Sequence, residues 1–237
     1  MKKHLSVLML FIRSTLYKFL LIVLFMAVVQ GMLFSFAFKG AEGYYGLDTV
    51  LAASHLGIVC AVCFLMLCAL LCLAGCNFGS KQSYTLARLR VSLRSVFIWQ
   101  SIHNAGILFL FWAAECGIIL AFCSVYITQN PQPQATMLVF YQNAFLHNLF
   151  PLADWSRHVY NIVLLASLAT SMACFPIRIR RRQKPLASFV ITAVCILSFR
   201  HEMGSLGVNI CLSFVVAFIA VMAVRGIWKE LDYAGLS

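Results

Sequence analysis

Charged side chains are scarce in this chain: only 11% of its 237 residues are Asp, Glu, Lys or Arg, whereas 62% are hydrophobic. A soluble domain usually contains about 25% charged and about 45–50% apolar residues. A soluble fold with this composition would need a large core and would have almost no polar surface to cover it. The composition therefore excludes an ordinary soluble domain and predicts an all-α, polytopic membrane protein.

The sequence also lacks the motifs of several enzyme classes. It contains neither the H-E-x-x-H pattern of metalloproteases nor the G-x-S-x-G pattern of serine hydrolases. The nearest approach to an ATP-binding loop is GCNFGSKQS at 75–83, where Ser80 separates Gly79 from Lys81 and Gln82 follows the lysine. A P-loop needs Gly, Lys and Ser or Thr in direct succession. We therefore expect a non-enzymatic chain that binds no cofactor and no metal.

The ten cysteines do not suggest a disulfide framework, because all of them lie in apolar runs. Those between Cys60 and Cys76 fan around a helix instead of converging, and no His or carboxylate completes a metal site among them. We expect these cysteines to pack as small apolar residues.

Six segments are apolar enough to be transmembrane helices. About 20 apolar residues are needed to cross a hydrocarbon core roughly 30 Å thick. The fifth segment is the weakest, because Arg200, His201 and Glu202 directly follow its last apolar residue, Phe199. The predicted spans cover residues 19–38, 50–75, 104–127, 159–177, 186–203 and 205–224.

The formal net charge is +11, from 18 basic and 7 acidic residues. The basic residues lie in short segments between apolar runs, which argues against a nucleic-acid partner. If both termini are cytoplasmic, the outer segments hold only Lys39, Arg157 and Arg200, and the other 15 basic residues lie inside. By the positive-inside rule this bias predicts six spans with both termini inside. We expect a multi-pass protein of the cell membrane, and specifically of a bacterial inner or cytoplasmic membrane.

Two further apolar segments are predicted to lie at the membrane surface. Residues 1–18 carry Lys2, Lys3 and Arg13, and they are expected to form an amphipathic interfacial helix among the lipids of the inner leaflet. The 14 residues of 137–150 reach only about 21 Å as a helix, which is too short to cross the membrane. We expect them to form an interfacial or re-entrant helix on the outer face.

Residues 83–97 form a basic, half-apolar segment between two predicted spans. In a helix over 86–97, five apolar side chains share one face and Arg90 and Arg94 flank it. The chain is then expected to turn into the bilayer near His103 and Asn104. The pattern leaves two alternatives open: a helix that only rests on the lipid surface, or a helix that docks on a cytoplasmic partner.

The run SYTLARLRVSLRSVFIWQSIHNA at 83–105 resembles the region after the second helix of ABC-2-type transporter permeases. The match is carried by six residues: Leu86, Arg88, Leu89, Val91, Ser92 and Arg94. Six spans, an N-terminal amphipathic helix and two cytoplasmic ends are also similar to that family. In contrast to the family pattern, the long outer segment lies between the third and fourth spans instead of the fifth and sixth.

The resemblance implies a permease subunit of an ATP-driven transporter, and specifically an exporter of a peptide, a lipid or another hydrophobic substrate. It implies that residues 83–97, including Arg90, contact a separate ATP-binding cassette ATPase subunit, which would bind ATP and Mg²⁺. It further implies a homodimer, or a heterodimer with a second permease.

Glu115 is the one carboxylate deep within a predicted span, where a charged group is costly. It is therefore expected to face a partner helix or a wet cavity, or to be protonated. His103 and Asn104 lie nearer the cytoplasmic end of the same helix. These three residues are expected to form a substrate path or a proton relay, or else to make interhelical hydrogen bonds. An alternative function is a self-sufficient secondary carrier, or a small substrate-binding membrane subunit, that uses Glu115.

Overall fold

The computed structural model describes residues 2–40, 46–76, 92–129, 133–152, 154–201 and 205–234. All regular structure in these ranges is α-helical, as predicted. The helices are α1 (Lys2–Gly40), α2 (Leu47–Ala53), α3 (Leu56–Gly75), α5 (Leu93–Gln129), α6 (Pro133–Gln142), α7 (Ala144–Leu149), α8 (Trp155–Arg180), α9 (Leu186–Arg200) and α10 (Leu206–Ala234).

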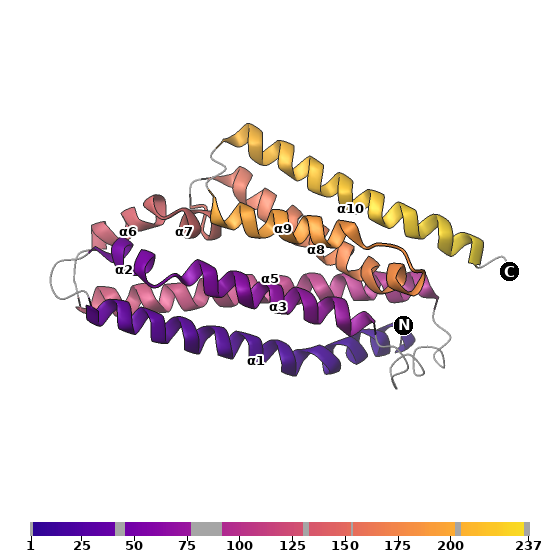
Figure 1. Ribbon diagram of the computed structural model, residues 1–237, viewed down its shortest axis with the longest axis horizontal. Helices are drawn as coiled ribbons and strands as arrows, with labels where there is room; N and C mark the ends of the chain where they lie inside the picture. The colour runs from indigo at the N-terminus through magenta and orange to yellow at the C-terminus, as the bar shows by residue number, and fades with distance from the viewer. Residues whose placement is uncertain are drawn as a thin grey trace.

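The long helices form an elongated bundle in which successive helices run in opposite directions (Figure 1). Both marked termini and the α8–α9 connection lie at one end of the bundle, and α2, α6 and α7 lie at the other. The basic run Arg178–Lys184 falls in or beside that connection. The positive-inside rule therefore predicts that the end with the termini faces the cytoplasm, and the end with α2, α6 and α7 is called the outer end on this basis.

Among the described residues, five helices are long and apolar enough to cross a membrane, which supports a multi-pass membrane protein. The apolar spans within them are Leu8–Lys39, Leu56–Ala74, Arg94–Thr128, Trp155–Arg180 and Leu206–Trp228. The fifth predicted span, 186–203, corresponds to α9, which is apolar but has only 15 residues. Large apolar side chains such as Leu24, Phe36, Phe214 and Phe218 are exposed on the bundle surface, as expected for helices that face lipid.

The packed centre of the bundle lies around α8, which contacts α3, α5, α9 and α10. Its Leu164, Leu168 and Met172 are completely buried. They pack with Met26 of α1 and Leu67 of α3, among other side chains. Because lipid chains are as apolar as these residues, close packing rather than exclusion of water stabilises this core.

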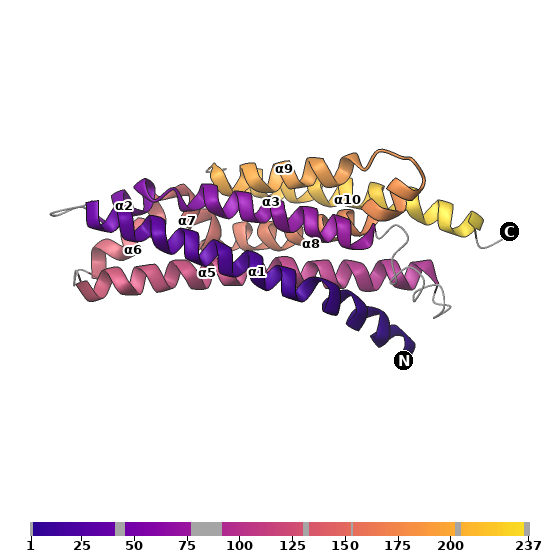
Figure 2. The same ribbon diagram turned by 60° about the horizontal axis from the view of Figure 1, so that its bottom comes forward.

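Two predicted boundaries are absent, because helices expected to be separate are continuous. The interfacial helix over 1–18 and the first span over 19–38 form the single helix α1, whose N-terminal part diverges from the bundle (Figure 2). The turn predicted near His103 and Asn104 is also wrong, since α5 passes through both residues without a break. Neither junction contains a proline, so the backbone hydrogen bonds of each helix continue through it.

Two other segments are more broken than predicted. The span expected over 50–75 is interrupted at Ser54 and His55, and His55 has the left-handed backbone angle φ of 49°. The outer segment 137–150 does not form one helix, because α6 ends before Asn143 and α7 begins after it. Asn143 caps α7, since its side-chain oxygen accepts from the backbone N–H groups of Phe145 and Leu146 at 3.1 and 3.3 Å.

Candidate functional site

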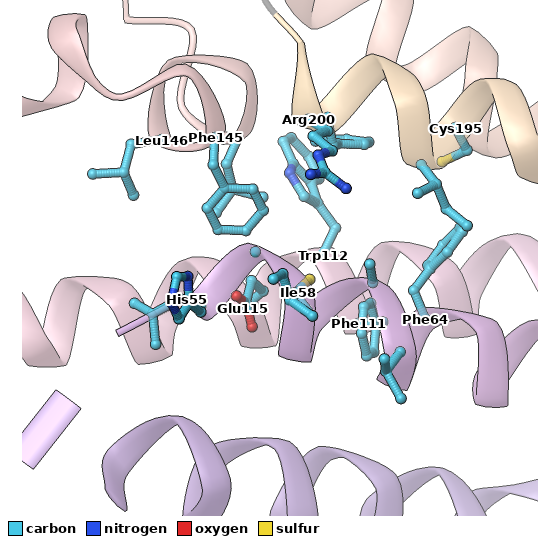
Figure 3. A pocket seen from close by; sticks show the side chains of 18 of the residues that line it. His55, Ile58, Phe64, Phe111, Trp112, Glu115, Phe145, Leu146, Cys195 and Arg200 are labelled. Atoms are coloured by element: carbon cyan, nitrogen blue, oxygen red, sulfur yellow. The ribbon is translucent and has the colours of Figure 1, made fainter. Parts of the chain in front are cut away.

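A cavity of about 410 Å³ lies between α3, α5, α7 and α9, in the outer half of the bundle (Figure 3). Most of its lining is apolar, and aromatic side chains contribute much of it. These are Phe64, Phe111, Trp112, Phe145 and Phe199. Its polar lining residues come from four different places in the chain: His55, Glu115, Asn143 and Arg200. A mostly apolar cavity with a few convergent polar groups is the usual form of a small-molecule site.

Glu115 is the most deeply buried of these polar residues, with 1% of its surface exposed. Gln30 of α1, which is completely buried, donates from Nε2 to Oε1 of Glu115 at 2.8 Å. The same Nε2 lies 3.4 Å from the carbonyl oxygen of Leu56, the first residue of α3. Gln30 therefore joins α1, α3 and α5 at the side of the cavity.

Three buried polar atoms beside the cavity have no hydrogen-bond partner within the described part of the chain. They are Oε2 of Glu115, Oε1 of Gln30 and Nε1 of Trp112. A buried polar group without a partner costs about 1–3 kcal/mol. Glu115 and Trp112 lie three residues apart on α5, so they share a face of that helix and both line the cavity. A ligand with a polar group at this position would satisfy atoms that the protein leaves unpaired.

The basic residues of the lining lie at its edges. Arg200 is the last residue of α9 and His55 lies at the break before α3, and both side chains are exposed. In Figure 3, His55 and Glu115 lie on the α3 and α5 side, whereas Phe145 and Arg200 lie on the opposite side. The predicted span 50–75 would place His55 within one continuous helix, whereas in the structure it lies at a break between two helices.

His103 and Asn104 do not line the cavity. His103 shares a hydrogen bond with the Thr15 hydroxyl of α1 at 2.8 Å, and its ring stacks on Phe11. Asn104 donates from Nδ2 to the carbonyl oxygen of Ala169 on α8 at 3.4 Å. Twelve residues of helix, or about 18 Å, separate His103 from Glu115. The structure thus separates Glu115 from the other two residues, and those two make interhelical hydrogen bonds.

Only part of the predicted ATPase contact can be located. Leu86, Arg88, Leu89, Arg90 and Val91 lie outside the described residues. Ser92 precedes α5, and its hydroxyl accepts from the backbone N–H of Ser95 at 3.3 Å.

Arg94 lies in the first turn of α5, and its guanidinium carbon is 5.7 Å from the centre of the Trp228 ring on α10. From Arg94 the same helix runs without a break to Glu115, a distance of about 32 Å by helical rise.

A second buried polar cluster lies at the outer end of α8. Arg157 is 3% exposed, and its Nη2 donates to the carbonyl oxygen of Ser198 and, at 2.9 Å, to its hydroxyl. Nη1 donates to Oδ1 of Asn209 at 3.4 Å, and the guanidinium lies over the Tyr160 ring. These contacts fasten α8 to α9 and α10. The sequence analysis counted Arg157 only as an outer charge and gave no sign of this cluster.

All ten cysteines are free thiols, and the described residues contain no group of three or more His, Cys, Asp or Glu side chains that could hold a metal ion. No family model, no curated protein and no solved structure matches this chain. The resemblance to ABC-2-type permeases therefore depends on residues 83–105 and on the order of the helices.

Proposed function

We propose that this chain is the membrane-spanning permease subunit of an ATP-driven ABC exporter in the bacterial cytoplasmic membrane. The observation that carries the proposal is the continuity of α5. One helix links the basic end near Arg94, where the resemblance implies contact with the ATPase, to Trp112 and Glu115 in the cavity. A displacement of the cytoplasmic end of a continuous helix also displaces the residues further along it.

Hydrogen bonds between α5 and α1 would transmit such a displacement to α1. The Thr15–His103 and Gln30–Glu115 hydrogen bonds join the two helices at two levels, on either side of the bundle centre. On the other side of the cavity, Arg157 holds α9 and α10 to α8. The cavity lies between these two groups of helices, so a shift of α1 and α5 against α8, α9 and α10 would open or close it.

The proposed assembly contains this permease, a second permease that is either identical or different, and ATP-binding cassette subunits that bind ATP and Mg²⁺. The permease itself would carry out no bond chemistry. Its substrate would be a peptide, a lipid or another hydrophobic compound, which is consistent with the apolar lining of the cavity.

The buried carboxylate of Glu115 favours one other candidate, a proton-coupled carrier that needs no ATPase. A carboxylate within a membrane bundle is a frequent proton-carrying group in transporters. In that mechanism Glu115 would exchange a proton and the substrate alternately, and the basic segment 83–97 would only rest on the membrane surface.

Purification from the native cell in mild detergent, followed by transport assays in inside-out vesicles, separates the two candidates. The permease proposal expects an ATP-binding subunit to co-purify and substrate uptake to require ATP. Transport driven by a proton gradient without any ATPase, and abolished in Glu115→Gln, would instead establish the carrier and refute the permease.

A further inference from the structure

The cavity presents a buried acid to an apolar, aromatic chamber. Oε1 of Glu115 accepts from the amide of Gln30, and Oε2 has no partner within the described part of the chain. An ionised carboxylate at this depth is costly unless a positive charge compensates it. The protein supplies the Gln30 amide and the Cys60 thiol beside this carboxylate, and neither carries a positive charge. A cation bound in the cavity would therefore complete the pairing.

The walls of the cavity suit the rest of such a ligand. Phe64, Phe111, Trp112 and Phe145 contribute aromatic rings to the lining. The face of an aromatic ring attracts a cation within about 6 Å of its centre, and indole does so best. The cavity of about 410 Å³ is within the range of about 300–1,000 Å³ that is typical of small-molecule sites.

The position of the cavity indicates how a ligand would reach it. Ile58, Val62 and Leu65 of α3 line the cavity, and each has about half of its surface exposed. They lie within the apolar span Leu56–Ala74, so their exposed surface faces lipid. The cavity therefore borders the bilayer along α3, and a ligand that enters there must partition into lipid.

Arg200 is a positively charged residue of the cavity lining, and it would repel a positively charged ligand. Its side chain is exposed at the outer end of α9, where water and salt weaken its field. Glu115 is almost completely buried, so its interaction with a ligand charge is screened much less. The buried acid therefore outweighs the exposed base.

We propose that the cavity binds a lipophilic monocation, whose positive charge pairs with the Glu115 carboxylate while its apolar body contacts the aromatic lining. The proposal specifies the substrate class of the transport site proposed above and rests on that function. Binding itself needs no ATPase, so the ligand class can be tested separately from transport.

The test uses the purified full-length chain in lipid nanodiscs with radiolabelled tetraphenylphosphonium as the probe. We expect saturable binding that weakens about tenfold or more in Glu115→Gln. Asn104→Ala is the matched control, because Asn104 is a buried polar residue of α5 outside the cavity. This variant should bind tetraphenylphosphonium with the same affinity as the unchanged protein. Tetraphenylborate, of similar shape and opposite charge, should show no binding that depends on Glu115.

A second variant keeps the test informative if Glu115→Gln does not fold. Ala61→Phe adds a ring to the cavity lining and should reduce tetraphenylphosphonium binding, whereas Ala113→Phe places the same ring on an exposed position of α5 and should not. Equal affinity in the unchanged protein and Ala61→Phe, or in the unchanged protein and a folded Glu115→Gln, would overturn the ligand assignment.

Failure of the ligand proposal and failure of the permease proposal give different results. Absence of phosphonium binding from a preparation that contains an ATPase would reject the monocation and leave the permease in place. Phosphonium binding that depends on Glu115, in a chain that never associates with an ATPase, would retain the monocation and reject the permease.

Discussion

Gln30 on α1 donates a hydrogen bond from Nε2 to Oε1 of Glu115 on α5, across 2.8 Å, and neither side chain has more than 1% of its surface exposed. The pair joins two of the longest helices, α1 and α5, at the side of the cavity. Its remaining oxygens, Oε1 of Gln30 and Oε2 of Glu115, lack partners within the described residues. A proton on Glu115 would provide a donor for one of these acceptors.

The first prediction concerns the energy of this pair. Gln30→Leu should lower the free energy of unfolding by about 1–3 kcal/mol, because it removes the amide that donates to the buried carboxyl group of Glu115. Combining it with Glu115→Leu should cost less than the sum of the two single changes, with a coupling of about 1 kcal/mol. Thermal unfolding of the four proteins in detergent measures the cycle. Strict additivity would show that the two side chains do not interact in the folded protein.

The second prediction concerns Arg157. Arg157→Met should destabilise the protein by about 2–3 kcal/mol, because it removes charge-assisted hydrogen bonds to Ser198 and Asn209 that hold α9 and α10. Arg157→Lys should recover little, since an ammonium group cannot reproduce the planar guanidinium fork. The unfolding temperature is the measurement, and the exposed Arg200→Met is the control that should leave it unchanged. Full stability of Arg157→Met would contradict the structural role given to this cluster.

The third prediction concerns the cytoplasmic end of α5. The double change Arg90→Glu and Arg94→Glu should leave membrane insertion intact but uncouple ATP hydrolysis from transport, because it reverses the charge of the proposed docking surface. Transport and ATPase activity in proteoliposomes are the readouts. Unchanged transport in this double variant would argue against an ATPase contact at residues 83–97.

The fourth prediction tests whether α5 transmits movement. Ile102→Pro, at an exposed position of α5 between Arg94 and Glu115, should kink the helix and abolish substrate-stimulated ATPase activity. Tetraphenylphosphonium binding in the cavity should persist, because the residues that line it lie beyond the kink. Ile102→Ala removes the same side chain without affecting the backbone and should retain coupling. Normal coupling in a folded proline variant would contradict a role for helix continuity.

The fifth prediction concerns pH. A proton and a cationic ligand compete for Glu115, so affinity for tetraphenylphosphonium should fall as pH is lowered, by at most about tenfold per unit. Four other titratable residues line the cavity, namely His55, Cys60, Cys195 and Arg200. His55→Gln is therefore the required control and should preserve the pH dependence, which Glu115→Gln should remove. If His55→Gln removed the pH dependence and Glu115→Gln did not, the proton would compete with the ligand at His55, and the prediction would be wrong.

The fold class follows from the sequence, and so does the burial of Glu115, because both depend on the cost of exposing polar groups to lipid. The partner of Glu115 was not predicted, although a signal existed: Gln30 is a lone amide within the apolar run 19–38. Such a residue requires a hydrogen-bond partner on another helix. Pairing the isolated polar residues of different spans would have found this contact.

Helix boundaries were harder to predict, for two physical reasons. A helix does not end where its apolar residues end, so α5 and α10 continue well beyond the predicted spans. The break at Ser54 and His55, in contrast, occurs where neither glycine nor proline is present. It is accompanied by contacts between distant segments: Gln30 approaches the carbonyl oxygen of Leu56, and Gly57 lies against the ring of Phe145. Contacts of this kind are invisible to local sequence patterns.

The crossing by α9, which corresponds to the fifth predicted span, can be tested directly, because α9 is the shortest of the helices proposed to cross. A membrane-impermeant maleimide should label His201→Cys in intact cells and Lys184→Cys only after permeabilisation, since the two exposed residues flank opposite ends of α9. The unchanged chain, with its ten native cysteines, provides the background. Labelling of both variants from the same side would make α9 a re-entrant helix.

The length of α9 also affects the membrane around it. Fifteen helical residues extend about 22 Å, whereas the hydrocarbon core is about 30 Å thick. Leu186, Phe189 and Leu197 of α9 are at least half exposed, so lipid reaches this helix along its length. If α9 crosses the membrane, we expect the surrounding leaflets to become thinner here, which reduces the hydrophobic mismatch. The bilayer next to α9 would then be compressed, close to the exposed Arg200 at the end of this helix.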